Sequence, residues 1–331
     1  MMNIDPVEMK DLLTPYKIGR PLIVPSGQPG AFDERAADCP FVFYHNGRWH
    51  MTYIGYDGIG YQTAIASSDD LMEWRYDGMI LKRDAESGSW DANGAAGTWI
   101  VKVSDDLCEI PLLRKINGKY WMTYHSYPGI GYENGPAKIG LAWSEDEDLL
   151  AWHRLAEPVF SWEDGAEWES GGLYKSCIVE HDGTFYMFYN AKDRGNPWIE
   201  QTGLATSKDL EHWTRCDLNP VVRVTPGAWD SQFVSDPCVV RFGDRWTMFY
   251  FGYNGRNAQE GLAISDDLIA WRKSEMPVIT NGAPGSIDET HAHKASVVMK
   301  DGVLYHFYTA VRPADKGSFR CITVAVSAIN N

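Results

Sequence analysis

Five segments of the chain repeat one pattern: a pair of apolar residues, a short turn that contains glycine, and a run rich in aromatic residues. They are FVFYHNGRWHMTY from Phe41, LLRKINGKYWMTY from Leu112, IVEHDGTFYMFY from Ile178, VVRFGDRWTMFY from Val239 and VVMKDGVLYHFY from Val297. β-Branched and aromatic runs on either side of a glycine turn are typical of β-hairpins. The pattern therefore predicts five hairpins in sequence.

A second element follows four of these hairpins. It is an alternating strand, an Asp-Leu turn, and a tryptophan that opens another strand; the tryptophans are Trp74, Trp152, Trp213 and Trp271. We interpret these four as core packing residues because they recur at one position of the unit. Four short strands in a unit of about 60 residues are typical of a propeller blade. The sequence predicts an all-β fold, a five-bladed β-propeller that forms a single domain over residues 1–331.

The fifth unit ends at CITVAVSAINN without the turn and the tryptophan. The missing part has a counterpart near the start of the chain, where Arg20-Pro21-Leu22-Ile23 resembles the segments that follow the other tryptophans, such as Asn219-Pro220-Val221-Val222. We expect the N-terminal segment to complete the last blade and to close the ring, which leaves no open sheet edge. Residues 1–19 are then an N-terminal extension.

The charge balance and the lack of long apolar segments argue against nucleic acid and membrane as partners. Lys and Arg number 30 against 45 Asp and Glu, so the net charge is −15 and no basic surface for nucleic acid is expected. The N-terminal sequence MMNIDPVEMKDLL lacks the basic and apolar regions of a signal peptide, and no apolar run reaches the roughly 20 residues of a membrane helix. Six cysteines without a CxxC motif are expected to be small buried thiols. We expect a cytoplasmic protein with no nucleic-acid or membrane partner, and the sequence carries no signal for an oligomeric state.

One ionisable residue stands three positions before the apolar pair in every unit. These residues are Asp38, Glu109, Lys175, Asp236 and Lys294. The first strand of a propeller blade lines the central channel, so equivalent positions would point at one small volume. Buried charges are costly unless they are paired. The ring is therefore either an ion-pair network between blades or a functional site.

The loops at the same end of the blades add further candidates for substrate contacts. They are Arg35, Asp57, His125, His291, His293 and Arg312, together with several aromatic residues. Alternation places His291 and His293 on one side of an extended segment. Aromatic rings can stack on the flat faces of a sugar, while acids, bases and amides make directional hydrogen bonds to its hydroxyls. This mixture predicts a carbohydrate site.

The segments GQPGAFDERAADCPFVF and AWDSQFVSDPCVVRFGDRWTMFY, with the SDDL…W turns, resemble the five-bladed propeller glycosidases of the arabinanase/fructosidase-like group. That group includes glycoside hydrolase families 43, 62, 32, 68, 117 and 130, and the likeness extends over nearly the whole chain. By resemblance to family 43, Asp38 is the general base and Glu109 stands at the second position, where the family has an aspartate that tunes a pKa. The third family 43 position departs from the pattern, because Lys175 stands there and Glu169 lies six residues earlier.

Two other families imply different roles. Resemblance to family 117 implies Asp38, Asp236 and His293, with the histidine as the acid. Resemblance to family 130 implies a cationic phosphate pocket formed by Arg35, Lys175 and Lys294.

The leading hypothesis is an exo-acting, inverting glycoside hydrolase that cleaves a small oligosaccharide at the mouth of the channel. Asp38 is the predicted base and Asp236 or Glu109 the predicted acid, with His293 as a third candidate for the acid. The alternatives are a glycoside phosphorylase, with phosphate held by the lysines, and a carbohydrate-binding propeller without catalysis. None of these requires a cofactor, and a structural ion in the central channel is left open. The stretch from Asp84 to Asp106 lengthens the first connection between units and is interpreted as a specificity loop or a dimer contact.

Overall fold

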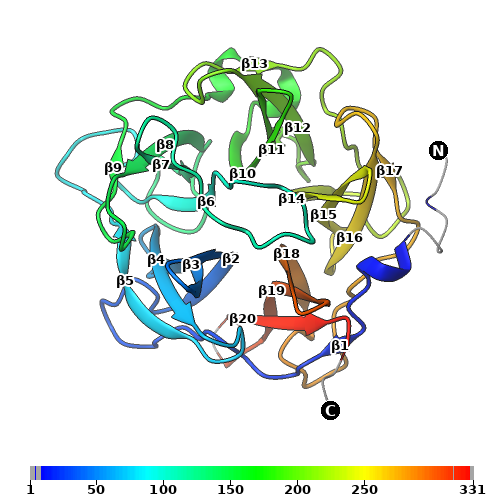
Figure 1. Ribbon diagram of the computed structural model, residues 1–331. Coiled ribbons are helices and arrows are strands. Elements are labelled where there is room, and N and C mark those ends of the chain that lie inside the picture. The colour runs from blue at the N-terminus through cyan, green and yellow to red at the C-terminus, as the bar shows by residue number, and fades with distance from the viewer. Residues whose placement is uncertain (1–3, 5–8, 316, 329–331) are drawn as a thin grey trace.

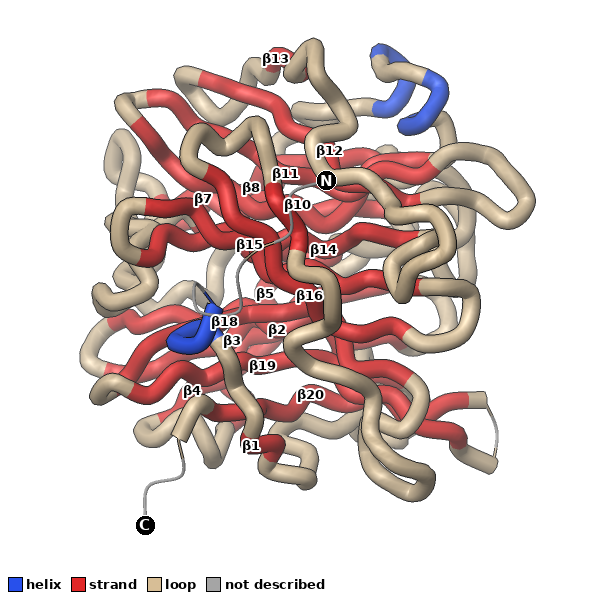
Figure 2. The backbone as a smooth tube through the Cα atoms, turned by 90° about the vertical axis from the view of Figure 1, so that its right-hand side faces the viewer, coloured by secondary structure: helices blue, strands red, loops and turns tan. Residues whose placement is uncertain are grey.

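The computed structural model describes residues 4, 9–315 and 317–328, and nearly all of their regular structure is β. Most of the strands form consecutive antiparallel groups arranged around a central axis, as in a β-propeller (Figure 1). Seen from the side, the strands run between two faces that carry the loops (Figure 2). No helix in the described part of the chain is long and apolar enough to cross a membrane.

The strand groups follow one another along the sequence. The first group contains β2 (Ala36–His45), β3 (Arg48–Tyr56), β4 (Tyr61–Ser68) and β5 (Arg75–Leu81), and the second contains β6 (Ala96–Ile100), β7 (Tyr120–Ser126), β8 (Lys138–Ser144) and β9 (His153–Arg154). The third contains β10 (Gly172–His181), β11 (Thr184–Lys192), β12 (Glu200–Ser207) and β13 (Thr214–Arg215), and the fourth contains β14 (Phe233–Phe242), β15 (Arg245–Tyr253), β16 (Ala258–Ser265) and β17 (Arg272–Lys273). The last contains β18 (His291–Lys300), β19 (Val303–Pro313) and β20 (Ser318–Val326). Three short 3-10 helices lie at Lys10–Leu12, Trp162–Asp164 and Glu167–Glu169.

The segment that precedes the first group packs along the outer edge of the last group. The short strand β1 (Tyr16–Lys17) pairs antiparallel with β20, with Lys17 opposite Ala325. Further along, Ile23 forms a bridge to Ile322. The two ends of the described part of the sequence therefore share one sheet, although residues 1–3 and 5–8 of the expected N-terminal extension lie outside the described residues.

The predicted hairpins form as β2–β3, β10–β11, β14–β15 and β18–β19, but the second one is different. Its first strand is β6, within the stretch expected to be a specificity loop or a dimer contact, and the residues from Val101 to Lys119 are an insertion between β6 and β7. This insertion crosses the centre of the view in Figure 1. The Leu107 N–H donates to the Arg241 carbonyl near the end of β14, and the Tyr44 N–H near the end of β2 donates to the Pro111 carbonyl. Leu112 belongs to this insertion. The predicted turn does form, because Ile116 and Lys119 pair across it, but the strand that pairs with β7 is β6.

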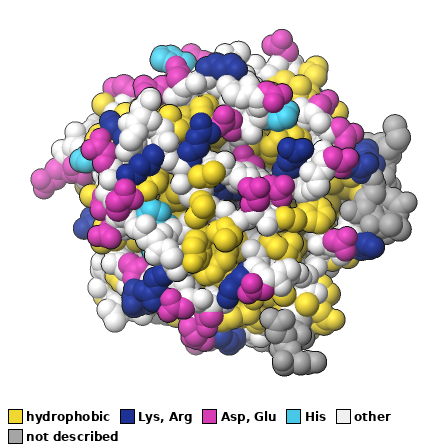
Figure 3. All heavy atoms as spheres, in the orientation of Figure 1, with side chains coloured by type: hydrophobic (Ala, Val, Ile, Leu, Met, Phe, Trp, Pro, Cys, Tyr) yellow, Lys and Arg dark blue, Asp and Glu magenta, His cyan; other side chains and the backbone are white. Residues whose placement is uncertain are grey.

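The four repeated tryptophans pack at the edge of the core, as predicted. Each indole N–H donates to the carbonyl of a leucine three residues earlier, from Leu71 at 3.1 Å to Leu210 at 2.7 Å. Those leucines are completely buried, so each tryptophan closes its turn against the hydrophobic core. On the outside of the molecule, Lys and Arg are interspersed with Asp and Glu over the face shown in Figure 3.

Candidate active site

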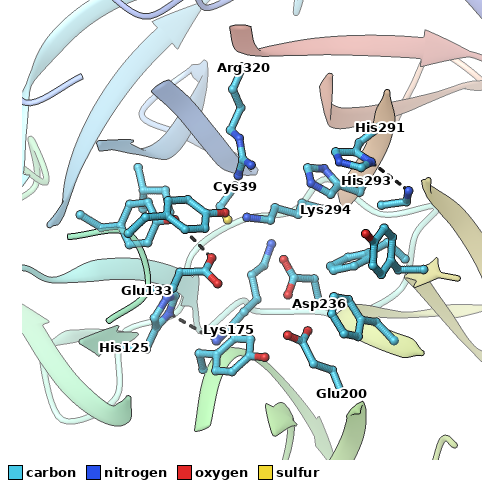
Figure 4. Close-up of a pocket in the computed structure, with 18 of the residues that line it drawn as sticks. Cys39, His125, Glu133, Lys175, Glu200, Asp236, His291, His293, Lys294 and Arg320 are labelled. Carbon is cyan, nitrogen blue, oxygen red and sulfur yellow. Dashed lines mark hydrogen bonds between the residues drawn. The ribbon is translucent and has the colours of Figure 1, made fainter. Parts of the chain in front are cut away.

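A pocket of about 290 Å³ opens at the end of the strands opposite the insertion (Figure 4). Its polar lining comes from several strand groups and consists of His125, Glu133, Lys175, Glu200, Gln232, Asp236, His291, His293, Lys294 and Arg320. Aromatic side chains form much of the remaining wall: Tyr61, Tyr127, Tyr132, Tyr174, Trp198, Phe233, Phe251 and Tyr253. This combination of ring faces and directional polar groups fits a small polar ligand such as a sugar.

A bulge recurs in the inner strands and places charged side chains in the pocket. The antiparallel pairing shifts register at Lys175 in β10, at Asp236 in β14 and at Lys294 in β18. All three residues have a positive φ, at 22°, 52° and 70°. A bulge leaves one residue out of the ladder and can redirect its side chain. Three members of the predicted ring are therefore brought together in the pocket.

Asp38 does not share this position, which corrects the predicted ring. The register pairs Asp38 with Ile54 and then Phe41 with Thr52, so the residue equivalent to Asp236 is Cys39. Cys39 has a φ of 50° and lines the pocket, whereas Asp38 does not line it. A shift of one residue along a strand moves a side chain to the other side.

The Asp38 carboxylate is instead a counter-ion between the first and last strand groups. It is 1% exposed and accepts hydrogen bonds from Lys294 Nζ at 2.9 Å, Thr309 Oγ1 at 2.8 Å and Arg320 at 2.6 Å. Burial alone would raise its pKa, but Lys294 and Arg320 hold the pKa of Asp38 well below its usual value. A carboxylate held in this way is a weak proton acceptor, so the geometry does not support the predicted role as general base.

Glu109 also lies away from the pocket. It is exposed in the insertion, and its N–H donates to the carbonyl of Asp106. The bulge of the second group falls at Thr98, between Gly97 and Trp99 in the register of β6 with β7. Counting three residues back from the apolar pair therefore selected the wrong residue in this unit. The insertion separates the first strand from the hairpin turn by about twenty residues more than in the other units.

Three predicted substrate contacts serve other parts of the structure and do not line the pocket. Arg35 is exposed and packs beside Gly58. Asp57 pairs with Arg83 and accepts the Ile59 N–H at 2.9 Å, which stabilises the turn between β3 and β4. Arg312 is exposed, with its guanidinium 4.9 Å from the centre of the Phe319 ring.

The predicted histidines do line the pocket. Burial and the nearby Lys294 lower the pKa of His125 to about 3 and that of His291 to about 4, with Arg320 acting more strongly than Lys294 on His291. Burial likewise lowers the pKa of His293 well below its usual value. All three rings are therefore neutral near pH 7.

The hydrogen bonds of these neutral rings determine which nitrogen carries the proton. His125 Nδ1 accepts the Lys175 N–H at 3.3 Å, and His291 Nδ1 accepts the Ala258 N–H at 3.0 Å. Both rings therefore carry the proton on Nε2. His293 Nδ1 donates to the Thr309 carbonyl at 3.2 Å, which leaves its Nε2 as an acceptor.

Two important carboxylates, Glu133 and Glu200, were missed by the sequence analysis, as was Arg320. Glu200 and Arg320 occupy one position of the third strand, five residues before an alanine that recurs as Ala205 and Ala325. A search for this second ring would have found them. Glu133 comes from the loop between β7 and β8, which is longer than the equivalent loop in the other units.

Glu200 has the most distinctive environment of the pocket carboxylates. It is 5% exposed and accepts hydrogen bonds from Trp198 Nε1 at 2.9 Å and Ser235 Oγ at 2.8 Å. Burial, with a further contribution from the negative charge of Glu133, raises the pKa of Glu200 to about 6. A proton held at this pKa can be delivered to a substrate at near-neutral pH.

Asp236 lies at the inner wall of the same pocket. Burial raises its pKa, although Lys175 and Lys294 oppose the shift. Its carboxylate accepts from the Asn190 amide, and its own N–H donates to Asn190 Oδ1 at 2.6 Å. These contacts hold the side chain in one orientation, which suits the binding of a substrate hydroxyl.

The described residues hold no group of three or more His, Cys, Asp or Glu arranged for a metal ion. The six cysteines are free thiols, and four of them, Cys39, Cys177, Cys238 and Cys321, are buried.

Comparison with known proteins identifies similar chains. The family model described as "Glycosyl hydrolases family 32 N-terminal domain" matches residues 111–277. A solved structure of a complex that is described by the names BT0996 and RGII is 31% identical, with a TM-score of 0.84 over 98% of this chain and 94% of that one. A second solved structure, described as "Glycoside hydrolase", is also 31% identical with a TM-score of 0.84, over 99% of this chain and 97% of that one.

A curated relative is more distant. The 1,2-beta-oligomannan phosphorylase of Thermoanaerobacter sp. (strain X514) is 27% identical over 134 residues. The match covers 38% of this chain and 45% of the phosphorylase, so this chain matches less than half the length of that relative.

Proposed function

The protein belongs to the family described as glycosyl hydrolases family 32 N-terminal domain, and on that premise we propose that it is an exo-acting glycoside hydrolase that works in the pocket around Glu200. The protein is a glycoside hydrolase with a β-propeller fold. We interpret its strand groups as five blades, with the segment that contains β1 completing the last blade and closing the ring. The expected cytoplasmic location stays a prediction.

The observation that carries the mechanism is the raised pKa of Glu200, a buried carboxyl group in a pocket that holds a second carboxylate, Glu133. Burial raises the pKa of Glu200 and the negative charge of Glu133 adds to the shift, so Glu200 keeps its proton to a higher pH than an ordinary glutamate. In glycosidases the acid works beside a second carboxyl group, and a raised pKa is the mark of the acid. We assign Glu200 as the general acid that protonates the leaving oxygen.

Glu133 is the proposed second carboxylate. In Figure 4 its side chain and that of Glu200 reach into the pocket from different elements. In an inverting reaction Glu133 would activate the water that attacks the anomeric carbon. Asp236, an acid candidate from the sequence analysis, would bind a substrate hydroxyl in this arrangement.

The size of the pocket supports an exo mode of action. A volume of about 290 Å³ is enough for one or two sugar rings. The insertion between β6 and β7 lies at the opposite end of the inner strands, so it does not cover the mouth of this pocket. The description of a 31% identical relative names RGII. We propose that the substrate of this protein is the terminal sugar of a saccharide related to RGII.

Phosphorolysis is the second candidate, since a phosphorylase is among the relatives and three cations line the pocket. These cations already face carboxylates, however. Lys294 and Arg320 pair with Asp38, and Lys175 is attracted to Asp236. A phosphate ion needs an excess of positive charge, so the charge balance favours hydrolysis.

The test is the release of sugar from saccharides of the RGII type and from a panel of aryl glycosides, each with and without inorganic phosphate. We expect phosphate-independent release that Glu200→Gln lowers by about 10² or more. Release that requires phosphate would establish a phosphorylase instead. Saturable sugar binding without release of product from any substrate would support the carbohydrate-binding alternative.

A further inference from the structure

A buried ionic cluster recurs in four of the strand groups, away from the pocket around Glu200. Each cluster contains a buried acid, the hydroxyl of a strand tyrosine and a cation from the outermost strand. The acids are Asp91, Glu169, Asp230 and Asp288, the tyrosines are Tyr124, Tyr189, Tyr250 and Tyr308, and the cations are Arg154, Arg215, Lys273 and Lys17. The distance from the cation to the acid lies between 2.5 and 3.0 Å in all four.

The position of the cation follows from the pairing of the strands. In each group the outermost strand places one residue opposite an alanine of the third strand. The pairs are Arg154 with Ala142, Arg215 with Ala205, Lys273 with Ala263 and Lys17 with Ala325. In the first group the same register places Tyr76 opposite Ala66. The first group therefore has a tyrosine where the others have a lysine or an arginine.

The acid of the first group is left without a cation. Asp33 occupies the position of the other acids and is 8% exposed. Within the described residues, no ion pair reaches the Asp33 carboxylate, and no hydrogen bond is donated to it, not even by the equivalent tyrosine, Tyr53. The Asp33 carboxylate faces an open cavity, whereas the four other groups pair the equivalent acid with a cation.

The missing cation leaves a cavity beside Asp33. It has a volume of about 610 Å³, and its walls include Phe32, Tyr53, Trp74 and Tyr76 together with the segment from Leu22 to Ala31. In three other groups the residue before the acid is a tryptophan that stacks on the strand tyrosine, as Trp90 does on Tyr124 with ring centres 5.6 Å apart. The smaller ring of Phe32 adds to the space. Tyr76 stays 54% exposed at the rim, so a ligand can enter from solvent.

We propose that this cavity is a binding site for an organic monocation, an alkylammonium or alkylguanidinium group on an aliphatic stem. The charged end would pair with Asp33 in the place that a lysine or arginine side chain takes in the other groups. The surrounding rings would attract the cation by cation–π interaction. The cavity shares no lining residue with the pocket around Glu200, so the proposal is independent of the proposed function.

The direct test uses calorimetry to measure binding of n-butylammonium and n-butylguanidinium to the full-length protein, with n-butanol as the uncharged control. We expect saturable binding of at least one of the two cations, in the millimolar range or tighter, and no binding of butanol. Asp33→Asn keeps the size of the side chain and removes its charge, and it should weaken cation binding about tenfold or more. Failure of both cations to bind, or equal binding by the Asn variant, would overturn the proposal.

A second variant separates a specific site from general attraction to a protein of net charge −15. Tyr76→Lys restores the cation found in the other groups, so it should raise the melting temperature and abolish binding of the added cation. Glu109→Gln removes one exposed negative charge far from the cavity and should leave binding unchanged. Cation binding that survives Tyr76→Lys, or that weakens equally in Glu109→Gln, would show that the Asp33 cavity is not the site.

Discussion

The negative charge of Glu133 acts on Glu200 and helps to raise the pKa of its carboxyl to about 6. The two residues come from different strand groups, because Glu133 lies in the loop before β8 and Glu200 begins β12. Their proximity exists only in the folded protein. Together with burial, which is the larger cause, this proximity gives Glu200 a pKa suited to a proton donor near neutral pH.

Removing the proposed acid tests this relationship most directly. Glu200→Gln keeps the size of the side chain and its capacity to accept from Trp198 and Ser235, but it cannot deliver a proton. We expect kcat/KM on an unactivated saccharide to fall by about 10²–10⁴. A substrate with a good leaving group, such as a nitrophenyl glycoside, needs less protonation and should lose less. Equal losses on both substrates would contradict the assignment.

The pH profile gives a second test. A general acid must be protonated, so kcat/KM should decline as the pH rises through about 6, the pKa of Glu200. Glu133→Gln removes a negative charge that raises this pKa, and the alkaline limb should move to lower pH in any residual activity. If the alkaline limb of the kcat/KM profile falls at the same pH in Glu133→Gln as in the original protein, another group supplies the proton.

The same pKa affects stability. The folded-state pKa of Glu200 lies above that of an exposed glutamate, so the folded protein binds this proton more tightly than the unfolded protein does. The contribution is complete below about pH 4 and is lost as the pH rises through about 6, with a total of about 2 kcal/mol. Glu200→Gln should remove this part of the pH dependence, which is measurable by urea unfolding at about pH 4 and pH 7. Identical pH dependence in the two proteins would contradict the raised pKa.

Asp38 should prove structural. Asp38→Asn leaves Lys294 and Arg320 without their buried counter-ion, and we expect the free energy of unfolding to fall by about 3–5 kcal/mol. Chemical denaturation measures this loss. The exposed Glu109 serves as the matched control, and Glu109→Gln should change stability by no more than about 0.5 kcal/mol and leave activity unchanged. A stable but inactive Asp38→Asn protein would instead indicate that Asp38 takes part in the reaction.

The repeated ionic clusters predict a further difference between strand groups. Lys273 is buried beside Asp230, so Lys273→Met should leave an unpaired buried acid and lower the free energy of unfolding by about 3–5 kcal/mol. The first group already lacks this cation, and Tyr76→Phe should have an effect below about 1 kcal/mol. Urea unfolding of both variants compares the two groups within one protein.

The local pattern of the sequence determined much of this protein by itself. Apolar pairs, glycine turns and aromatic runs predicted the hairpins, because side-chain alternation and turn geometry are local properties. They also identified Lys175, Asp236 and Lys294 as equivalent positions. The tertiary structure decided where these residues and their neighbours point.

Three residues show why the remainder needed the folded protein. Asp38 precedes the bulge by one position, and a shift of one residue turns a side chain to the other side of a strand. Glu109 lies within an insertion whose sequence resembles the repeat but whose segment before the turn does not pair with β7. Glu133 belongs to a loop that is longer than its counterparts, and its charge acts on Glu200 only because the strand groups converge on one axis. Local sequence determines the strands, whereas contacts between distant segments determine which charges share a pocket.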